Sequence, residues 1–488
     1  MRVIELLDRL PGGNLAGDGD VEVAGITHDS RKVKVGDVFA ALPGASNHGV
    51  EFLSQALSNG AAAVLSNRGR PEGLRVPWIR SSKPRRLMAH AAWALAGDPQ
   101  NSLQMIGITG TNGKSTTAHL VSRIMAAAER PAAFMGTLGY FLPSGQIVPA
   151  DRTTPEASDL APLLRRTVDL GGRVVAMEVS SHALVQDRLA GLEFHVAAWT
   201  NLSRDHLDFH GDMESYFEAK RRLFDEHLAA DGRRVLPVDD PWGARLLDDR
   251  RSGDVSWGLG HGDVFAREVD SDLLGSRFLL VSGGATTPIR LSLMGVHNLR
   301  NALTAAAVAH AAAIPPEAIR KGLESATPLS GRLERISLDL PFPVLVDYAH
   351  TPGGLRTVLQ SLKRLTDRKL ITVFGAGGDR DAGKRGPMGY AVGEIADVAV
   401  VTSDNPRSED PGVVAAAVSE GVRAAGGHPV VVLDRREAIA HALEIADEKS
   451  LVIVAGKGHE TTQTTGGEVV QFSDQEVILD LAGRVMCG

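Results

Sequence analysis

The sequence predicts an α/β protein of three domains, and three features of the chain lead to this prediction. Short runs rich in Val and Ile alternate with longer stretches whose apolar residues recur at helical spacing, as in parallel-sheet proteins. The 488 residues, 43% of them hydrophobic, suffice for about three cores at roughly 100–200 residues per domain. Linker-like segments at 97–102 and 328–336 divide the chain into domains 1–98, 99–330 and 331–488.

The first two domains are each predicted from three strand-like runs. In the first, a small α/β unit, the runs are 21–30, 37–42 and 61–66. In the second, they are 102–109, 173–180 and 194–200, followed by a predicted helix at 213–228. Strand-like runs separated by helical material indicate α/β units in both.

The third domain is predicted to be a doubly wound, Rossmann-like sheet. Its buried strands are expected at 343–349, 370–376, 397–404, 429–434 and 451–456. Amphipathic stretches between them supply the crossover helices of such a sheet. Ligands of these sheets bind at the carboxyl ends of the strands. We therefore expect a binding edge at Asp347, Gly375, Asp404 and Gly456.

Composition excludes several classes of protein. Lys and Arg number 52 and Asp and Glu number 59, so the net charge of −7 argues against general nucleic-acid binding. Cys487 is the only cysteine, so no intrachain disulfide can form. Glu5 and Asp8 interrupt the first apolar run, unlike the core of a signal peptide, and no run of 18 apolar residues occurs. We expect a cytoplasmic monomer without a membrane span.

The segment TGTNGKST (109–116) has the strongest chemical signature in the chain. Glycines after a strand let backbone N–H groups surround phosphate oxygens, while Lys114 reaches the terminal phosphates and Ser115 suits Mg²⁺. The generic motif has glycine where this chain has Ile108, so a glycine-rich turn without a ligand is the alternative. The residues of the predicted nucleotide loop are Gly110, Thr111, Asn112, Gly113, Lys114, Ser115 and Thr116.

Polar residues beyond later strands complete the predicted nucleotide site. Glu178 ends a strand, where a carboxylate can bind Mg²⁺. His206 follows another strand, although taken alone it is more typical of a structural histidine. Lys220 lies in a predicted helix, and composition alone indicates an ordinary lysine on the helix surface.

Six motifs occur in a fixed order along the chain. They are TGTNGKST (109–116), EVSSHAL (178–184), NLSRDHLDFH (201–210), GVHNLRN (295–301), SGRLE (330–334) and DYAHTP (347–352). This set resembles the Mur ligases, ATP-dependent enzymes that add amino acids to a UDP-linked sugar in making peptidoglycan precursors. The resemblance covers essentially the whole chain. The phosphate loop of this family begins one residue later than the generic motif, which accounts for Ile108.

The resemblance implies roles for individual positions. Lys114, Glu178, His206 and Lys220 match catalytic residues; Lys220 is expected as N6-carboxylysine and, with Ser115, Glu178 and His206, as a ligand of Mg²⁺. Further ATP contacts are expected at Asn298, Arg332 and Asp347. The residues that match positions binding UDP-MurNAc-dipeptide are Ser30, Ala45, Ser46, Asn47, Thr153, Thr154, Ser180, Gln186 and Arg188. The chain departs from the family at Arg152, where asparagine is usual, and at His48, where aspartate is expected.

Two further motifs, DNPR (404–407) and GKGHE (456–460), predict the amino acid that is added. The resemblance associates DNPR with meso-diaminopimelate, which has a second carboxylate that lysine lacks. The guanidinium of Arg407 can pair with that carboxylate through two hydrogen bonds. With lysine bound it would stay unpaired, a mismatch that can reject a substrate by roughly 10⁴-fold. The expected contacts are Arg385, Asp404, Asn405, Pro406, Arg407, Gly456 and Glu460.

The expected reaction joins the amine of diaminopimelate to the D-glutamate carboxylate of UDP-MurNAc-L-Ala-D-Glu through an acyl phosphate. Four alternatives remain: a lysine-adding ligase of the same family, a folylpolyglutamate synthetase, an NAD-binding third domain, and a P-loop switch or motor. The NAD alternative has an incomplete fingerprint, since GAGGDR (375–380) lacks its last glycine. DNPR alone is also typical of a turn after a strand.

Overall fold

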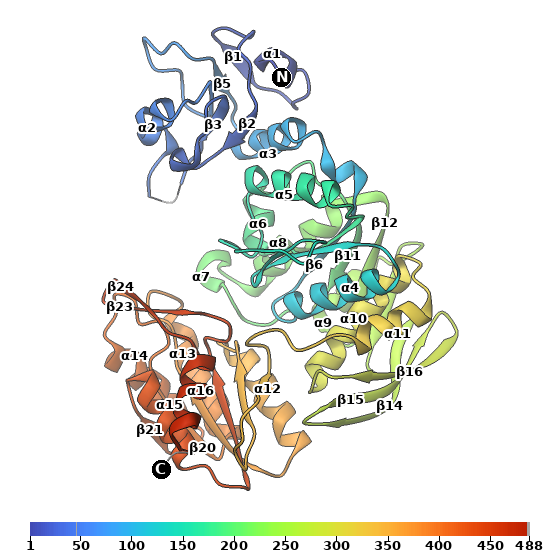
Figure 1. The fold of residues 1–488 in the computed structure, drawn as a ribbon, viewed down its shortest axis with the longest axis vertical. Coiled ribbons are helices and arrows are strands. Elements are labelled where there is room, and N and C mark those ends of the chain that lie inside the picture. The colour runs from blue at the N-terminus through green and yellow to red at the C-terminus, as the bar shows by residue number, and fades with distance from the viewer. Residues whose placement is uncertain (45, 486–488) are drawn as a thin grey trace.

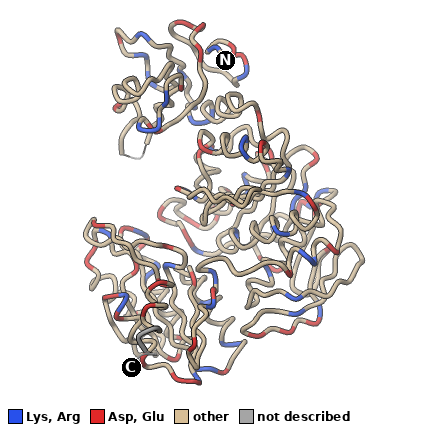
Figure 2. Tube along the Cα trace, in the orientation of Figure 1, with Lys and Arg blue, Asp and Glu red and all other residues tan. Residues whose placement is uncertain are grey.

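The computed structural model describes residues 1–44 and 46–485, and Figure 1 shows three sheet-containing units along the chain. Ala45 and Cys487 lie outside the described residues. The predicted mixed α/β fold with parallel-rich sheets is confirmed. Within the described part of the chain, none of the helices combines the length and apolar character that a membrane crossing requires. Lys and Arg are interspersed with Asp and Glu over all three units (Figure 2).

The N-terminal unit contains a five-stranded sheet with the order β1-β5-β4-β3-β2. Its strands are β1 (Asn14–Ala16), β2 (Gly25–Thr27), β3 (Asp37–Ala41), β4 (Ala63–Ser66) and β5 (Trp78–Arg80). The helices are α1 (Val3–Leu7), α2 (Leu53–Ser58) and α3 (Pro84–Leu95). The strand expected at 21–30 is shorter, because the Asp29 side chain accepts a hydrogen bond from Arg31 N and starts a 3₁₀ turn.

The central unit contains an eleven-stranded sheet with the order β16-β15-β14-β13-β12-β11-β6-β10-β7-β8-β9. The strands from β6 to β13 are β6 (Gln104–Thr109), β7 (Ala132–Gly136), β8 (Gly139–Phe141), β9 (Ile147–Val148), β10 (Val174–Glu178), β11 (Phe194–Trp199), β12 (Leu228–Pro237) and β13 (Val255–Gly258). An antiparallel extension that the sequence did not predict consists of β14 (Val264–Asp272), β15 (Gly275–Ser282) and β16 (Ala285–Leu291).

Helices cover both faces of the central sheet and form two apolar cores. One core contains α4 (Lys114–Ala127), α10 (Val296–Ala311) and α11 (Pro316–Glu324). The other contains α3, α5 (Ala157–Asp169) and α8 (Met213–Asp225). The helix predicted at 213–228 therefore ends three residues early, because β12 begins at Leu228. Shorter helices are α6 (Ser181–Val185), α7 (Leu207–His210) and α9 (Pro241–Leu247).

The C-terminal unit contains a six-stranded sheet with the order β17-β18-β22-β19-β20-β21. The strands are β17 (Glu334–Ile336), β18 (Val344–Asp347), β19 (Lys369–Phe374), β20 (Val398–Val401), β21 (Pro429–Val431) and β22 (Ser450–Ala455). The five predicted strands are thus present, all parallel, with β17 antiparallel at the edge.

Helices pack on both faces of the C-terminal sheet, as a doubly wound fold requires. One face carries α12 (Pro352–Leu365), α13 (Arg385–Ile395) and α14 (Pro411–Ala424). The opposite face carries α15 (Arg435–Glu444) and α16 (Asp474–Val485). A separate two-stranded hairpin consists of β23 (Thr462–Thr465) and β24 (Glu468–Gln471).

Candidate active site

The loop between β6 and α4 has the geometry of a phosphate-binding turn. Gly110 and Gly113 have φ values of 144° and 84°, which side chains rarely tolerate. A Cβ at Gly110 would lie 1.9 Å from Thr200 Oγ1, and one at Gly113 would lie 2.2 Å from Asn301 Oδ1. The Lys114 ammonium group donates to Gly110 O and Thr111 O, each at 2.9 Å. Glycine is therefore required at positions 110 and 113. Among the described residues, the Lys114 ammonium group has no carboxylate partner.

A cavity of about 520 Å³ lies between this loop and the C-terminal unit. It brings together residues from α4, α10 and the segment leading into α12. The predicted ATP contacts that line it are Thr111, Asn112, Gly113, Lys114, Ser115, Thr116, Asn298, Arg332 and Asp347. Gly110 does not line the cavity, and its backbone carbonyl accepts hydrogen bonds from Lys114 and Lys220.

Arg332 and Asp347 bring opposite charges into this cavity. The Arg332 guanidinium lies 4.6 Å from the centre of the Tyr348 ring, and its Nη2 donates to Ser115 Oγ at 3.4 Å. Its Nε is buried and has no hydrogen-bond partner within the described part of the chain. Burial raises the pKa of Asp347, while Arg332 and hydrogen bonds from two backbone N–H groups oppose that rise. Arg332 can therefore bind an additional acceptor such as a phosphate oxygen.

Glu178 and Lys220 lie beside the phosphate loop. A Cβ at Gly136 would lie 2.0 Å from Glu178 Oε1, which accepts a hydrogen bond from Thr137 N at 2.9 Å. Lys220 is 1% exposed, and its Nζ donates to Gly110 O at 2.8 Å. Burial, followed by the charge of Lys114, lowers the pKa of Lys220 well below its ordinary value. The helix-surface interpretation of Lys220 is therefore wrong, and burial favours the uncharged form of its amine.

His206 lies at the start of α7 in a left-handed conformation, with φ of 52°. Its Nε2 is 3.4 Å from Asp205 Oδ2, and burial lowers its pKa to about 4, so the imidazole is neutral. Ser115, Glu178 and His206 all line the cavity. Among the described residues, no group of three or more His, Cys, Asp or Glu side chains is arranged to hold a metal ion.

Several residues of the predicted dipeptide site form one network next to Glu178. Thr154 Oγ1 donates to Glu178 O at 2.8 Å and accepts from Ser180 N at 3.0 Å. Arg188 donates to Thr154 O at 2.9 Å and to Gln186 Oε1 at 2.8 Å. Thr153 joins this group at the cavity wall.

The other predicted contacts to the UDP-sugar belong to the N-terminal unit. Ser30 donates to Gln55 Oε1 at 2.7 Å, and Ser46 and Asn47 lie in the loop after β3. His48, one of the two departures from the family, caps the next turn by accepting from Val50 N at 3.2 Å. These residues do not line the cavity.

The predicted amino-acid contacts gather at the carboxyl ends of β20 and β22. Asn405 donates to Asp404 Oδ1 at 3.0 Å and to Glu460 Oε2 at 2.9 Å, and it accepts from Lys457 Nζ at 3.2 Å. Pro406 is buried, and Gly456 has a φ of 115°. Of the edge predicted from strand ends, Asp404 and Gly456 therefore lie at a polar network that does not line the nucleotide cavity, whereas Asp347 lines that cavity.

Two arginines border this network. Arg407 has a φ of 55°, is partly buried, and donates through Nη1 to Gly378 O at 2.5 Å. It forms no ion pair within the described residues. Arg385 Nη2 instead pairs with Glu409 Oε1 at 2.7 Å, while its buried Nε has no partner in the described part of the chain. Both side chains therefore keep donors for a further carboxylate.

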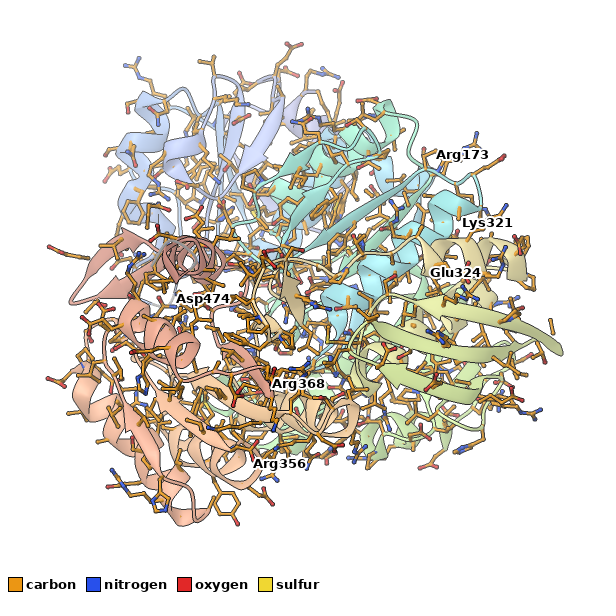
Figure 3. All side chains as sticks on the ribbon, turned by 60° about the horizontal axis from the view of Figure 1, so that its bottom comes forward. Arg173, Lys321, Glu324, Arg356, Arg368 and Asp474 are labelled. Carbon is orange, nitrogen blue, oxygen red and sulfur yellow. The ribbon has the colours of Figure 1, made fainter. Side chains whose placement is uncertain are left out.

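A fully buried ion pair lies at the carboxyl end of β22, next to this network. Arg435 donates to Asp474 at 2.7 and 2.8 Å, and its Nη2 also reaches Ala455 O at 3.0 Å. Asp474, labelled in Figure 3, is the first residue of α16. This pair joins the starts of α15 and α16 to the end of β22.

Sequence reasoning missed several residues at these sites, among them Thr137, Asn201, Tyr348, Lys457 and Gln463. Asn201 accepts from Asn112 N at 3.1 Å, Tyr348 lies against Arg332, and Lys457 and Gln463 contact the DNPR segment. Asn201 and Tyr348 follow the ends of parallel strands, and Lys457 lies within GKGHE, so each had a positional signal. Gln463 had none.

Three protein-family descriptions match most of the chain. Residues 22–94, 108–309 and 331–458 match the family descriptions "Mur ligase family, catalytic domain", "Mur ligase middle domain" and "Mur ligase, glutamate ligase domain". The chain belongs to the Mur ligase family. This Mur ligase is an ATP-dependent ligase, as the resemblance predicted.

Relatives match over nearly the full length of this Mur ligase. A Geobacter metallireducens protein named UDP-N-acetylmuramoyl-L-alanyl-D-glutamate–2,6-diaminopimelate ligase is 42% identical, covering 96% of this chain and 94% of the relative. A protein of the same name from Streptomyces coelicolor is 41% identical, covering 97% and 95%. A solved structure with that name has a TM-score of 0.68 at 31% identity, covering 100% of this chain and 99% of the other.

More distant structures share the fold. The MurF ligase from Thermotoga maritima in complex with ADP has a TM-score of 0.66 at 18% identity, covering 95% of this Mur ligase and 98% of that chain. A Mycobacterium tuberculosis folylpolyglutamate synthase complexed with ADP has a TM-score of 0.65 at 22% identity, covering 83% and 94%.

Proposed function

We propose that this Mur ligase joins meso-diaminopimelate to the D-glutamate carboxylate of UDP-MurNAc-L-Ala-D-Glu, with ATP as the energy source. The observation that carries the proposal is Arg407, a partly buried guanidinium without an ion-pair partner among the described residues, at the edge of the amino-acid network. A second carboxylate on the incoming amino acid would supply that partner. The names of the relatives at 41–42% identity support this choice.

The reaction first activates a carboxylate that an amine cannot attack directly. A carboxylate oxygen of D-glutamate forms a bond to the γ-phosphorus of ATP, and the bond to ADP breaks. The amine of diaminopimelate then attacks the acyl carbon, loses a proton, and phosphate leaves from a tetrahedral intermediate. Lys114 and Arg332 line the nucleotide cavity and would offset the charge on the transferring group.

The donors along the cavity fit Mg²⁺. Ser115 and Glu178 offer oxygen atoms and His206 offers a neutral imidazole, all facing the same space. Mg²⁺ at nucleotide sites takes one or two carboxylates plus phosphates and waters, so a closed protein cage is not required. We assign Ser115, Glu178, His206 and carbamylated Lys220 as its holders. The bound ion would supply further neutralisation of phosphate charge.

We infer that Lys220 carries a carbamate. Its amine is buried and its pKa is lowered by that burial, and an unprotonated amine is the form that adds carbon dioxide. In that step an N–C bond forms and one proton leaves, so a neutral amine becomes an anionic carbamate. Protein equilibrated with ¹³C-bicarbonate should show a carbamate resonance that Lys220→Met lacks. A parent spectrum without that resonance would contradict the assignment.

Each ligand is assigned to one of three domains, 1–98, 99–330 and 331–488. The N-terminal domain would bind the uridine end through Ser30, Ser46 and Asn47. The central domain would bind ATP and the dipeptide, and the C-terminal domain would bind diaminopimelate. We propose that the enzyme acts in the cytoplasm as a monomer. Light scattering of the purified protein would test the oligomeric state.

The deciding experiment measures ADP release with UDP-MurNAc-L-Ala-D-Glu and one amino acid at a time. We expect rapid release with meso-diaminopimelate and release near background with lysine. Equal rates with both amino acids, or faster release with lysine, would assign the lysine-adding activity instead. ADP release that needs no dipeptide substrate would indicate an ATPase without ligase chemistry.

A further inference from the structure

The β23–β24 hairpin has no obvious part in the core of the C-terminal unit. Within residues 1–44 and 46–485, its four-residue strands pair only with each other, apart from a bridge between Thr465 and Arg407. All residues of β24 are exposed, including Val469 at 65% and Val470 at 50%. The hairpin therefore buries little apolar surface, and its contacts to the DNPR segment call for another explanation.

Backbone hydrogen bonds hold Arg407 from both sides. Arg407 N donates to Thr464 O at 3.0 Å, and Gly466 N donates to Arg407 O at 2.6 Å. Arg407 has a φ of 55°, a left-handed conformation that is strained for a non-glycine residue. Such a conformation persists only when surrounding contacts impose it, and here the hairpin supplies two of them.

The first strand of the hairpin, β23, also forms hydrogen bonds with the residues before Arg407. Gln463 Nε2 donates to Asp404 O at 2.7 Å, and Thr464 N donates to Asn405 Oδ1 at 3.0 Å. The buried Lys457 connects the same elements, because its Nζ donates to Thr462 O at 2.7 Å and to Asn405 Oδ1 at 3.2 Å. The hairpin thus contacts the segment at three of its four residues.

We propose that the β23–β24 hairpin is a positioning element for amino-acid recognition, with Gln463 as the side chain through which it acts. By fixing the backbone of residues 404–407, the hairpin directs the Arg407 guanidinium toward the far carboxylate of the amino acid. The loop at Gly378, whose carbonyl accepts from Arg407 Nη1, forms the opposite wall. This inference rests on the proposed function, because it concerns the residue that distinguishes diaminopimelate from lysine.

Two substitutions at one position test the proposal. Gln463→Ala removes the donor to Asp404 O, and Gln463→Glu keeps the shape but replaces the donor with an acceptor. Losing one hydrogen bond corresponds to about a fivefold effect. We expect the KM for diaminopimelate to rise about fivefold in Gln463→Ala and further in Gln463→Glu. The KM for ATP and kcat at saturation should stay unchanged, and the preference for diaminopimelate over lysine should fall. Val469→Ala, on the exposed strand, is the matched control and should behave like the parent.

The outcomes separate this inference from the proposed function. A parent enzyme that does not use diaminopimelate defeats the proposed function and the inference together. A parent that uses it, with both variants within twofold of the parent in KM and in preference over lysine, defeats the inference alone. A fall in kcat without a change in KM for diaminopimelate would also overturn it, because the hairpin would then act on the chemical step.

Discussion

The nucleotide cavity and the amino-acid site satisfy their charged groups in different ways. In the described part of the chain, the Lys114 ammonium group hydrogen-bonds to two backbone carbonyls, and the buried Nε of Arg332 has no partner. In the amino-acid site, Asn405, Lys457 and Glu460 bond to one another. The cavity thus keeps its cations available for phosphate, whereas the amino-acid site uses most of its polar groups to fix its own shape. Substitutions should therefore affect chemistry in the first region and amino-acid affinity in the second.

The largest effect is expected in the cavity, at Lys114. Lys114→Met removes a cation aimed at the transferring phosphoryl group, and we expect kcat to fall by about 10²- to 10³-fold. ADP release measures this, with thermal unfolding to check the fold. The matched control is Lys321→Met, since Lys321 lies on the surface of α11 with 62% of its side chain exposed. If the kcat of Lys114→Met stays within tenfold of the parent, the cavity does not act mainly on the chemical step and the contrast with the amino-acid site is wrong.

The next effect is expected at the edge of the amino-acid site. Arg407→Ala should lower kcat/KM for diaminopimelate by about 10²-fold while the KM for ATP stays the same, because a charged hydrogen-bonded pair contributes about 1.5–3 kcal/mol. Arg407→Lys keeps the charge but loses the planar fork, so about tenfold is expected. Arg356→Ala, at the surface position on α12 labelled in Figure 3, is the control. Equal efficiency of Arg407→Ala and the parent would exclude Arg407 from recognition.

Acid should destabilise the region around the cavity. Burial lowers the pKa of His206, His210 and His459 to about 4, against an ordinary 6.5. Between these values the unfolded chain binds protons that the folded chain does not, so the stability is present above pH 6.5 and is lost as the pH falls toward 4. Each histidine should contribute on the order of 1 kcal/mol or less, because solvent screens the partly exposed imidazoles such as that of His206. Urea unfolding at pH 7, 6, 5 and 4 measures this, and a flat profile would contradict it.

The smallest effect is expected at Arg152, a departure from the family. Arg152 Nη1 pairs with Glu156 Oε1 at 2.7 Å, and Glu156 also lies 3.2 Å from Arg188 Nε. The Arg152 side chain is 45% exposed and already paired with Glu156. Arg152→Asn should therefore change the KM for UDP-MurNAc-L-Ala-D-Glu by less than about threefold. A tenfold rise in that KM would show that Arg152 contacts the substrate.

Apolar runs predicted the five parallel strands of the C-terminal sheet, because buried strands read as continuous Val- and Ile-rich segments, but they did not predict the parallel strands β5, β7, β12 and β13. β14 and the β23–β24 hairpin escaped prediction, since their sequences, VFAREVDSD, TQTT and EVVQ, are largely polar and their strands largely exposed. The helix predicted at 213–228 lost its last turn to β12, which pairs with β11 from Leu228 onward. Tertiary pairing, which the local pattern does not record, decided that boundary.

Some of the site residues could be predicted from the sequence better than others. The phosphate loop was visible because its glycines and Lys114 follow a strand directly. Lys220 was misjudged on composition, although Tyr216 and Phe224 lie one turn before and after it on the buried face of α8, a spacing that indicated burial. Arg407 was identified from its motif, but the hairpin that holds it lies about 60 residues later. Contacts over such a separation depend on the folded topology.

A crystal structure of the enzyme with ADP and the diaminopimelate-containing product tests the central claim most directly. The account predicts that the Arg407 guanidinium forms two hydrogen bonds with the far carboxylate, with residues 404–407 still held by the hairpin. An Arg407 side chain turned into solvent, with that carboxylate bound elsewhere, would contradict it.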